Sequence, residues 1–237
     1  MVNKINIGKS NTLKSGVFIL GIIFSMYLVF AITYEIVVSP RNVNETTSYA
    51  YNLTINNTNV TTGNITKVEI IFDVNFTFIN NTNGSSIGAN VTIDSNKLTW
   101  QGFNISNQTT AYFWINATAS FPATYNITIN LTNNYGGNFT NSSLTIVVND
   151  TTKPTITLIS PINGNTTLNA PGATFIFNVT DNSLTNCSLI LNGIIVNSNN
   201  SVNRIGGNTS FTNISYSAAN TWSVNCTDNA NNIANSS

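Results

Sequence analysis

Two cysteines are the residues of this chain best suited to covalent chemistry. Cys187 and Cys226 are its two cysteines, and each lies in a run where apolar and polar residues alternate. Leu189 shares the face of Cys187 and Trp222 that of Cys226, so both sulfur atoms should point into a core. In an oxidising compartment they would form a disulfide that closes a loop of about 40 residues and contributes roughly 3 to 4 kcal/mol. Buried free thiols are the alternative, and without a histidine or adjacent cation a catalytic pair is disfavoured.

Three aspartates could bind a metal ion. Asp150 lies in a polar stretch, Asp181 follows an apolar run, and Asp228 comes two residues after Cys226. Carboxylate oxygens are ligands that calcium prefers, so these residues predict a structural calcium site, and no other cofactor is expected. The alternative is that each aspartate ends a strand by bonding to its own turn.

Other catalytic chemistry is disfavoured by the residue types present. The chain has no histidine, which removes the usual general base near neutral pH and the commonest metal ligand. We find no glycine-rich phosphate loop and no zinc-ligand spacing. A pair of catalytic carboxylates would have to come from residues such as Glu45, Glu69 and Asp73, which fall on predicted loops or strand surfaces without an evident cleft. We therefore expect the chain not to be an enzyme.

Asparagine, serine and threonine supply most of the polar surface. Charged residues make up 7% of the chain, against about 25% in average soluble domains. The sequence holds 45 asparagines and 25 Asn-x-Ser/Thr sequons, where composition alone predicts about 11. We predict N-glycosylation at several of them, although both residue types also suit turns and exposed strand faces. The candidates are Asn52, Asn64, Asn104, Asn126, Asn138, Asn208 and Asn213.

The amino-terminal segment has the pattern of a membrane anchor. Residues 1–15 carry three lysines and no acid, and residues 16–34 carry no charge. The uncharged run is just long enough to cross a hydrocarbon core about 30 Å thick, and the lysines place its start on the cytoplasmic side. A retained signal anchor is favoured over a cleaved signal peptide, because Ala31 to Thr33 make a poor cleavage site. A pilin-type leader cut near Gly16 is a third interpretation.

The elements that must position these residues are strands. After residue 35 the hydrophobic pattern has a period of two, as in Tyr49 to Ile55 and in a long run from Val68 to Phe78, with turn residues between the runs. We predict an all-β protein of antiparallel two-sheet sandwiches. The aromatic residues Phe113, Trp114 and Trp222 are predicted to lie in the cores.

A repeat divides the strand-rich part into two modules. Ser39-Pro40 begins a pattern of alternating asparagines that returns 121 positions later at Ser160-Pro161, as in tandem domains. We assign the first module to residues 35–149, a linker to 150–154 and the second module to 155–237. By the spacing of the first module, the last strand of the second would begin near position 240. The chain would then be a piece of a longer array, or a subunit that borrows a strand from a neighbour.

The sequence also resembles a known group of surface proteins. The stretch from Val148 to Pro161, with Asn186-Cys-Ser-Leu189 and Thr221 to Ala230, is similar to the immunoglobulin-like (fibronectin-III-like) tandem modules of archaeal cell-surface and S-layer-like proteins. The resemblance implies two tandem immunoglobulin-like sandwiches after one amino-terminal transmembrane or signal helix. In that topology Asp150, Asp181 and Asp228 would converge on the end of the second module that faces the first.

These observations predict a non-catalytic structural or adhesive glycoprotein. It would be anchored in the cell membrane with its modules outside as a spacer, and would associate with itself, with other surface proteins or with glycans. Net charge is zero and the basic residues after residue 40 are scattered, so nucleic acid is not an expected partner. The alternative is a pilus or filament subunit that assembles through its apolar amino-terminal helix and strand exchange. The stalk of a surface enzyme whose catalytic domain lies further along the chain is a third interpretation.

Overall fold

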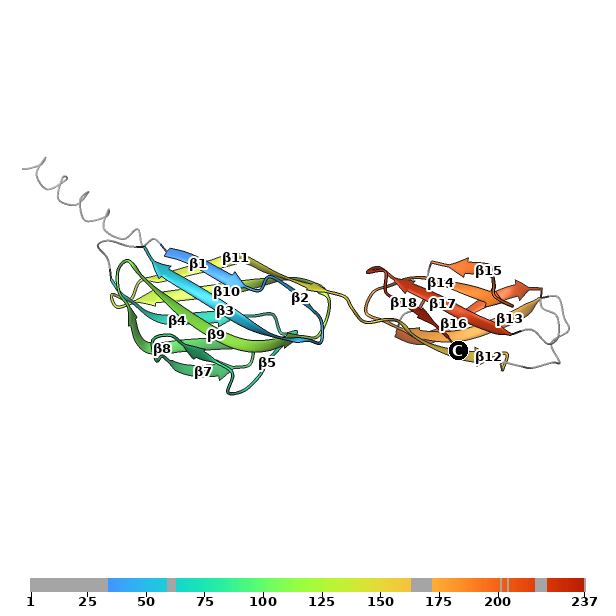
Figure 1. The fold of residues 1–237 in the computed structure, drawn as a ribbon, viewed down its shortest axis with the longest axis horizontal. Coiled ribbons are helices and arrows are strands. Elements are labelled where there is room, and N and C mark those ends of the chain that lie inside the picture. Colours follow the sequence, from blue (N-terminus) through green and yellow to red (C-terminus); the bar gives the residue numbers. More distant parts are fainter. Residues whose placement is uncertain are drawn as a thin grey trace, which may run out of the picture.

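The computed structural model describes residues 34–58, 63–162, 172–200, 202–203, 205–215 and 221–236. These residues form strands and connecting turns, and the part of the chain they cover contains no helix. Figure 1 shows two β-sandwiches placed end to end, joined by a short linker. The prediction of an all-β protein built on antiparallel sheets is confirmed.

The first module packs two sheets face to face. One sheet has the order β1 (Tyr34–Ser39), β3 (Ser48–Asn57), β9 (Thr109–Ala119) and β5 (Phe76–Phe78), with β6 (Gly84–Ser85) also paired to β9. The other has the order β2 (Asn42–Asn44), β11 (Asn138–Asn149), β10 (Ala123–Asn133), β4 (Ile65–Ile71), β8 (Lys97–Ile105) and β7 (Asn90–Asp94). All neighbours are antiparallel except β2 and β11, which are parallel.

Aromatic residues fill the core of this module. Tyr51, Phe72 and Phe76 are buried and stack edge to face or tilted, with ring centroids 5.1 to 6.1 Å apart. Tyr125 adds to this cluster, and its hydroxyl donates a hydrogen bond to the Phe121 carbonyl at 2.9 Å. A tyrosine that ties the start of a strand to the preceding corner is a recurrent feature of immunoglobulin-like sandwiches.

Two predictions for this module are wrong. The run from Val68 to Phe78 is not one strand, because β4 ends at Ile71 and β5 lies in the opposite sheet. The chain crosses between the sheets at Asp73, whose Oδ1 accepts a hydrogen bond from the Asn75 amide at 3.0 Å. Alternation alone could not show this crossing, because residues on both sides of it point into the same core.

Trp114 is the second correction. It was predicted to lie in the core, but it is 37% exposed, whereas its neighbour Phe113 is fully buried. Successive side chains of a strand point to opposite faces, so only one of two consecutive aromatics in β9 can enter the core.

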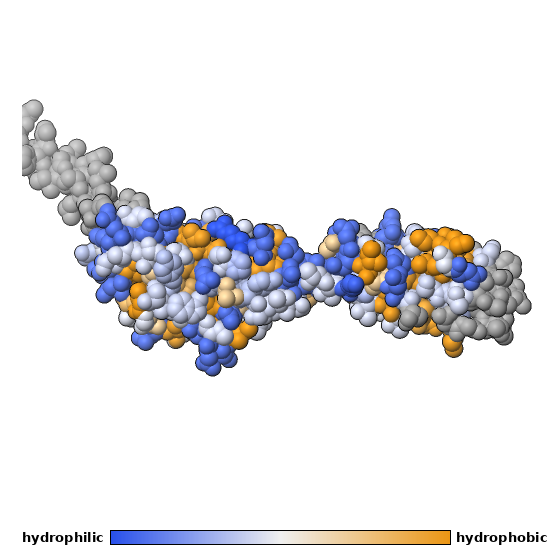
Figure 2. All heavy atoms as spheres, in the orientation of Figure 1, coloured by the Kyte–Doolittle hydropathy of each residue, from blue (hydrophilic) through white to orange (hydrophobic). Residues whose placement is uncertain are grey.

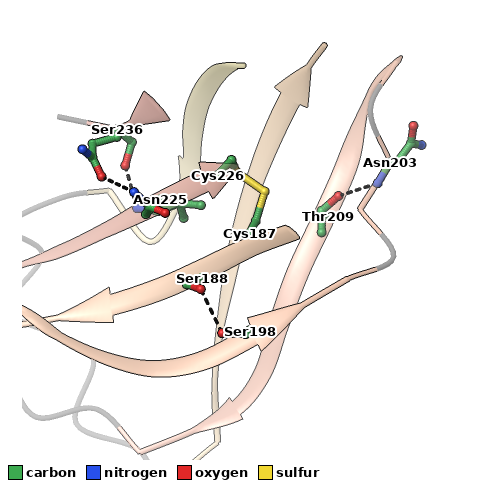
Figure 3. The surroundings of a disulfide bond; sticks show 10 residues. Cys187, Ser188, Ser198, Asn203, Thr209, Asn225, Cys226 and Ser236 are labelled. Atoms are coloured by element: carbon green, nitrogen blue, oxygen red, sulfur yellow. Dashed lines mark hydrogen bonds between the residues drawn. A yellow bond between two sulfur atoms is a disulfide. The ribbon is translucent and has the colours of Figure 1, made fainter. Parts of the chain in front are cut away.

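The second module is a smaller sandwich. Its sheets have the orders β12 (Thr155–Ser160), β13 (Ala173–Thr180), β16 (Ile205–Ile214), and β15 (Ile194–Asn199), β14 (Leu184–Leu191), β17 (Trp222–Asp228), β18 (Ile233–Asn235). The predicted disulfide is present: Cys187 of β14 and Cys226 of β17 are bonded, directly paired across the sheet and fully buried. Figure 3 shows this bond linking two adjacent strands of one sheet. Trp222 is buried, as predicted, and its indole N–H donates to the Pro161 carbonyl at 3.0 Å.

A strand beside β17 begins before position 240, where the spacing of the first module predicted the last strand of the second. β18 begins at Ile233 and pairs with β17 from Asn225 to Thr227. The spacing that pointed to position 240 assumed a later start for the last strand of the first module, whereas β11 begins at Asn138. In the second module a tight turn returns the chain at once, because Asp228 Oδ1 accepts hydrogen bonds from the amides of residues 230 and 232, each at 2.8 Å.

The two Ser-Pro positions of the repeat occupy equivalent places. Ser39-Pro40 ends β1, Ser160-Pro161 ends β12, and both peptide bonds are cis. After Pro40 the chain moves to the other sheet as β2, beside β11. The segment 163–171 that follows the second copy lies outside the described residues.

The predicted membrane segment 16–34 lies almost wholly outside the described residues, which begin at Tyr34 in β1. Among the residues that the structure covers, no helix has the length and apolar character needed to cross a membrane.

Candidate metal centre at the module junction

The three predicted aspartates meet where the two modules join. Asp150 directly follows β11, Asp181 directly follows β13, and Asp228 is the last residue of β17. One carboxylate oxygen from each lies within 4.8 Å of the other two. Asp228 is buried, and Asp150 and Asp181 are half-buried. Three segments far apart in the sequence thus bring three acids to one point.

Each aspartate also closes a turn of its own. Asp150 Oδ1 accepts a hydrogen bond from the Thr152 amide at 3.1 Å, and Asp181 Oδ1 accepts one from the Ser183 amide at 2.6 Å. Asp228 Oδ1 accepts from the two turn amides already described. Each aspartate therefore does end its strand by bonding to its own turn. A bound cation would use the lone pairs of the same carboxylates that these bonds leave free.

Glu45 is a fourth acid at this junction that the sequence did not indicate. It was predicted to lie on a loop or strand surface, but it is fully buried. Its Oε1 accepts hydrogen bonds from the linker amides of Thr151 and Thr152 at 3.2 and 3.1 Å, and its Oε2 accepts one from Asn182 Nδ2 at 2.9 Å. A side chain of the first module thus binds both the linker and the second module.

The position of Glu45 follows from the parallel pairing of β2 with the end of β11. Val43 pairs with Val148 and Asn44 with Asn149, and the Glu45 amide then donates to the Asn149 carbonyl at 3.0 Å. The next residue of the chain after Asn149 is Asp150, so the two acids must lie close together. A parallel pairing between distant segments leaves no local pattern in the sequence, which is why Glu45 was missed.

The electrostatics of the junction favour a positive partner. Burial raises the pKa of Asp150, and the neighbouring Glu45 carboxyl raises it further. Burial also acts to raise the pKa of Glu45, but the hydrogen bonds from Thr152 and Asn182 outweigh it and hold that pKa below its ordinary value. Glu45, Asp150 and Asp228 accept hydrogen bonds from backbone amides, from Ser183 and from asparagine side chains, and the Glu45 and Asp150 carboxyl groups also share a hydrogen bond.

The cluster has dimensions that suit calcium. Calcium binds six to eight oxygens at about 2.4 Å, so two oxygens on the same ion are at most about 4.8 Å apart. The three aspartate oxygens satisfy this limit. Asn232 offers an amide nearby: its Nδ2 donates to Asp228 Oδ2 at 2.8 Å and to the Asp150 carbonyl at 3.3 Å. The Asn232 nitrogen therefore holds the Asp228 carboxylate in place, and the oxygens that a hard cation would bind are those of the three carboxylates.

The predicted glycosylation candidates lie mostly on exposed strand faces. Asn52, Asn104, Asn126, Asn138 and Asn208 are exposed. Asn64 is half-buried, and the side chain of Asn213 lies outside the description. In most of these sequons the middle residue is buried while the asparagine faces solvent, as Leu53 and Ile127 show. An Asn-x-Thr pattern is thus also what a half-buried strand with a polar outer face requires.

No family model and no curated protein matches the chain. Among solved structures it is similar to BcpA, the major pilin subunit of Bacillus cereus, at 14% identity and a TM-score of 0.40, over 83% of this chain and 58% of the pilin. It is also similar to the fibronectin(III)-like modules of Clostridium thermocellum CbhA, at 13% identity and a TM-score of 0.31, over 86% of this chain and 90% of that one.

A third similar structure is a non-cellulosomal cohesin from Archaeoglobus fulgidus, at 6% identity and a TM-score of 0.34, over 51% of this chain and 92% of the cohesin. At these values the likeness concerns the β-sandwich fold alone and assigns no function. The chain spans less than two thirds of the pilin. The class defined by the strand order is a pair of immunoglobulin-like sandwich modules, one of them with a disulfide.

Proposed function

We propose that this chain is a non-catalytic cell-surface protein whose two modules form a stiff spacer, with a calcium ion fixing their junction. The observation that carries the proposal is Glu45. Its buried carboxylate joins the first module to the linker and to Asn182 of the second, within a group of four acids. Inter-domain contacts held by so many polar bonds restrict the hinge motion that tandem modules otherwise show.

The linker supports the same function. It is short, and its Pro154 is buried and has a fixed φ angle. A second bond crosses the junction from Asn232 of the second module to the Asp150 carbonyl. A cation bound by Asp150, Asp181 and Asp228 would tie the linker to two different strands of the second module, so that bending would have to break metal bonds.

A surface location fits the chemistry of the chain. The buried disulfide belongs to an oxidising compartment. Calcium at about millimolar concentration is available outside cells, where modules bind it with dissociation constants of roughly 0.1 to 1 mM. The apolar amino-terminal run would then anchor the spacer in the membrane, with the modules projecting outward.

The filament alternative gains less support from the described residues. Strand exchange requires an open place beside a terminal strand, and β18 takes part of that place next to β17. We therefore place the spacer first and the filament second.

Calorimetric titration of calcium into the metal-free full chain tests the proposal. We expect one site in the range of about 0.1 to 1 mM. Asp228→Asn should abolish binding, because the amide keeps an oxygen to cap its turn but loses the charge. Asp94→Asn, at an exposed position in the first module, is the matched control and should bind as the unaltered chain does. Absence of heat, or equal heat from the Asp228 variant, would refute the calcium site.

A further inference from the structure

The outer face of the sheet formed by β1, β3 and β9 carries a patch of large apolar side chains. Val37 is 43% exposed, Tyr112 52% and Trp114 37%. These strands are drawn in front in Figure 1, and Figure 2 shows hydrophobic residues among hydrophilic ones on the same side of the module. Apolar side chains gathered on a surface indicate that something covers them.

A sequon lies in the middle of this patch. Asn52 pairs across the sheet with Trp114, and Thr54 pairs with Tyr112 on one side and with Val37 on the other. Directly opposite residues have Cβ atoms about 5 Å apart. Asn52 is exposed and its sequon is completed by Thr54, so a sugar on Asn52 would begin on the same sheet face as two aromatic side chains, one strand away from them.

The indole of Trp114 leans over a glycine of the neighbouring strand. Gly84 of β6 pairs with Trp114, and a Cβ built on Gly84 would lie 2.5 Å from Cζ2 and 2.8 Å from Nε1 of the indole. Any larger residue at position 84 would push the ring away. Because β3 pairs with one edge of β9 and β6 with the other, the ring lies over β6, on the side of β9 away from Asn52, with part of its surface open to solvent.

We propose that Asn52 carries an N-linked glycan that extends across β9 and covers Tyr112 and Trp114. The C–H groups of a pyranose carry small positive charges, which the negative face of an aromatic ring attracts. In the modification, Asn52 Nδ2 bonds to C1 of a sugar carried on a polyprenyl diphosphate. The C1–O bond breaks, the diphosphate leaves, and the amide loses one proton to the transferase. The inference rests on the extracellular location proposed above.

Peptide mass spectrometry of the protein purified from the cells that make it is the first test. The peptide with Asn52 should carry sugar mass that enzymatic or chemical deglycosylation removes. An unmodified Asn52 overturns the inference, as does a patch found buried between two copies of an unmodified chain. Asn126 is the matched comparison, because it also lies exposed on a strand but faces Thr145 across the sheet instead of an aromatic residue.

A thermodynamic cycle is the second test. Asn52→Gln should lower the melting temperature of the first module by about 2 to 4 °C, and the same change in a Trp114→Thr background should lower it by less than about 1 °C. Asn126→Gln should give equal shifts in both backgrounds. If Asn52→Gln lowered the melting temperature equally in the two backgrounds, the proposed contact between the glycan and Trp114 would be overturned. If Trp114→Thr does not fold, Tyr112→Thr takes its place. Calcium titration is independent of this result, so the two proposals can fail separately.

Discussion

The first module is held by an aromatic core, whereas the second combines a smaller core with a disulfide. Among the described residues, the first buries Trp100, Phe72 and Tyr51 between strands of up to 12 residues. The second buries Phe175 and Trp222 beside the bonded cysteines. Small domains bury a smaller share of their surface and often add a covalent link. The comparison indicates that the modules draw on different sources of stability and should respond to different perturbations.

The largest effect is expected from a substitution that disrupts the aromatic core of the first module. Phe72→Ala should destabilise that module by about 3 to 5 kcal/mol, because the ring contacts Tyr51 and two other aromatics and leaves a cavity. Hydrogen exchange followed by mass spectrometry reports each module separately. Faster exchange in β3 and β4, with unchanged protection in β14 and β17, is the expected result. An equal loss in both modules would show that they do not unfold independently.

Removal of the disulfide should destabilise the second module and not the first. The double substitution Cys187→Ala and Cys226→Ala should destabilise the second module by roughly 3 to 4 kcal/mol and leave the first unchanged. Differential scanning calorimetry of the full chain should show one transition moved to lower temperature. Two unmoved transitions would mean that the bond contributes nothing to stability.

Removal of the hydroxyl group should destabilise the first module at one of its buried tyrosines but not at another. Tyr125→Phe loses the hydrogen bond to Phe121 and should destabilise by about 1 kcal/mol. The buried Tyr51 hydroxyl has no hydrogen-bond partner in the described part of the chain, and burial raises its pKa to about 12. Tyr51→Phe should therefore leave stability unchanged or raise it by up to about 1 kcal/mol. The midpoints of chemical denaturation of both variants, compared with that of the unaltered chain, show whether each change lowers or raises stability.

The smallest expected effect is a loss of stability of the first module at acid pH. Burial acts to raise the pKa of Glu69, but Lys67, whose Nζ lies 2.9 Å from Oε1, outweighs it, and the folded-state pKa is lower than the ordinary 4.5. The contribution of this pair is complete above about pH 5 and is lost as the pH falls through the folded-state pKa. We expect a loss of at most about 0.5 kcal/mol, because the pair is partly exposed. Lys67→Met should remove this part of the acid dependence, and high salt should weaken it.

Much of the fold followed from local sequence pattern. Period-two alternation identified the strands around Tyr51 and Cys226, and the repeated Ser-Pro positions located equivalent strand ends in both modules. The inward direction of both cysteines was also readable, because Cys187 and Cys226 share faces with apolar neighbours.

The features that the sequence did not reveal depend on long-range pairing. The crossing at Asp73 and the outward direction of Trp114 are set by which sheet each segment joins. The burial of Glu45 depends on β2 lying parallel to β11, more than one hundred residues away in the sequence. Such pairings are determined by the packing of the whole module, and a short stretch of sequence carries no information about them.

The distance between the two modules provides the most direct test of the spacer. Nitroxide labels at Thr110→Cys and Asn197→Cys, both on exposed positions, can be attached to the full chain while the native disulfide stays oxidised. Pulsed electron paramagnetic resonance should give one narrow distance distribution in calcium. The distribution should broaden after chelation and also in the Asp228→Asn variant. A distribution that is broad in calcium, or that stays equally narrow after chelation, would contradict a junction fixed by calcium.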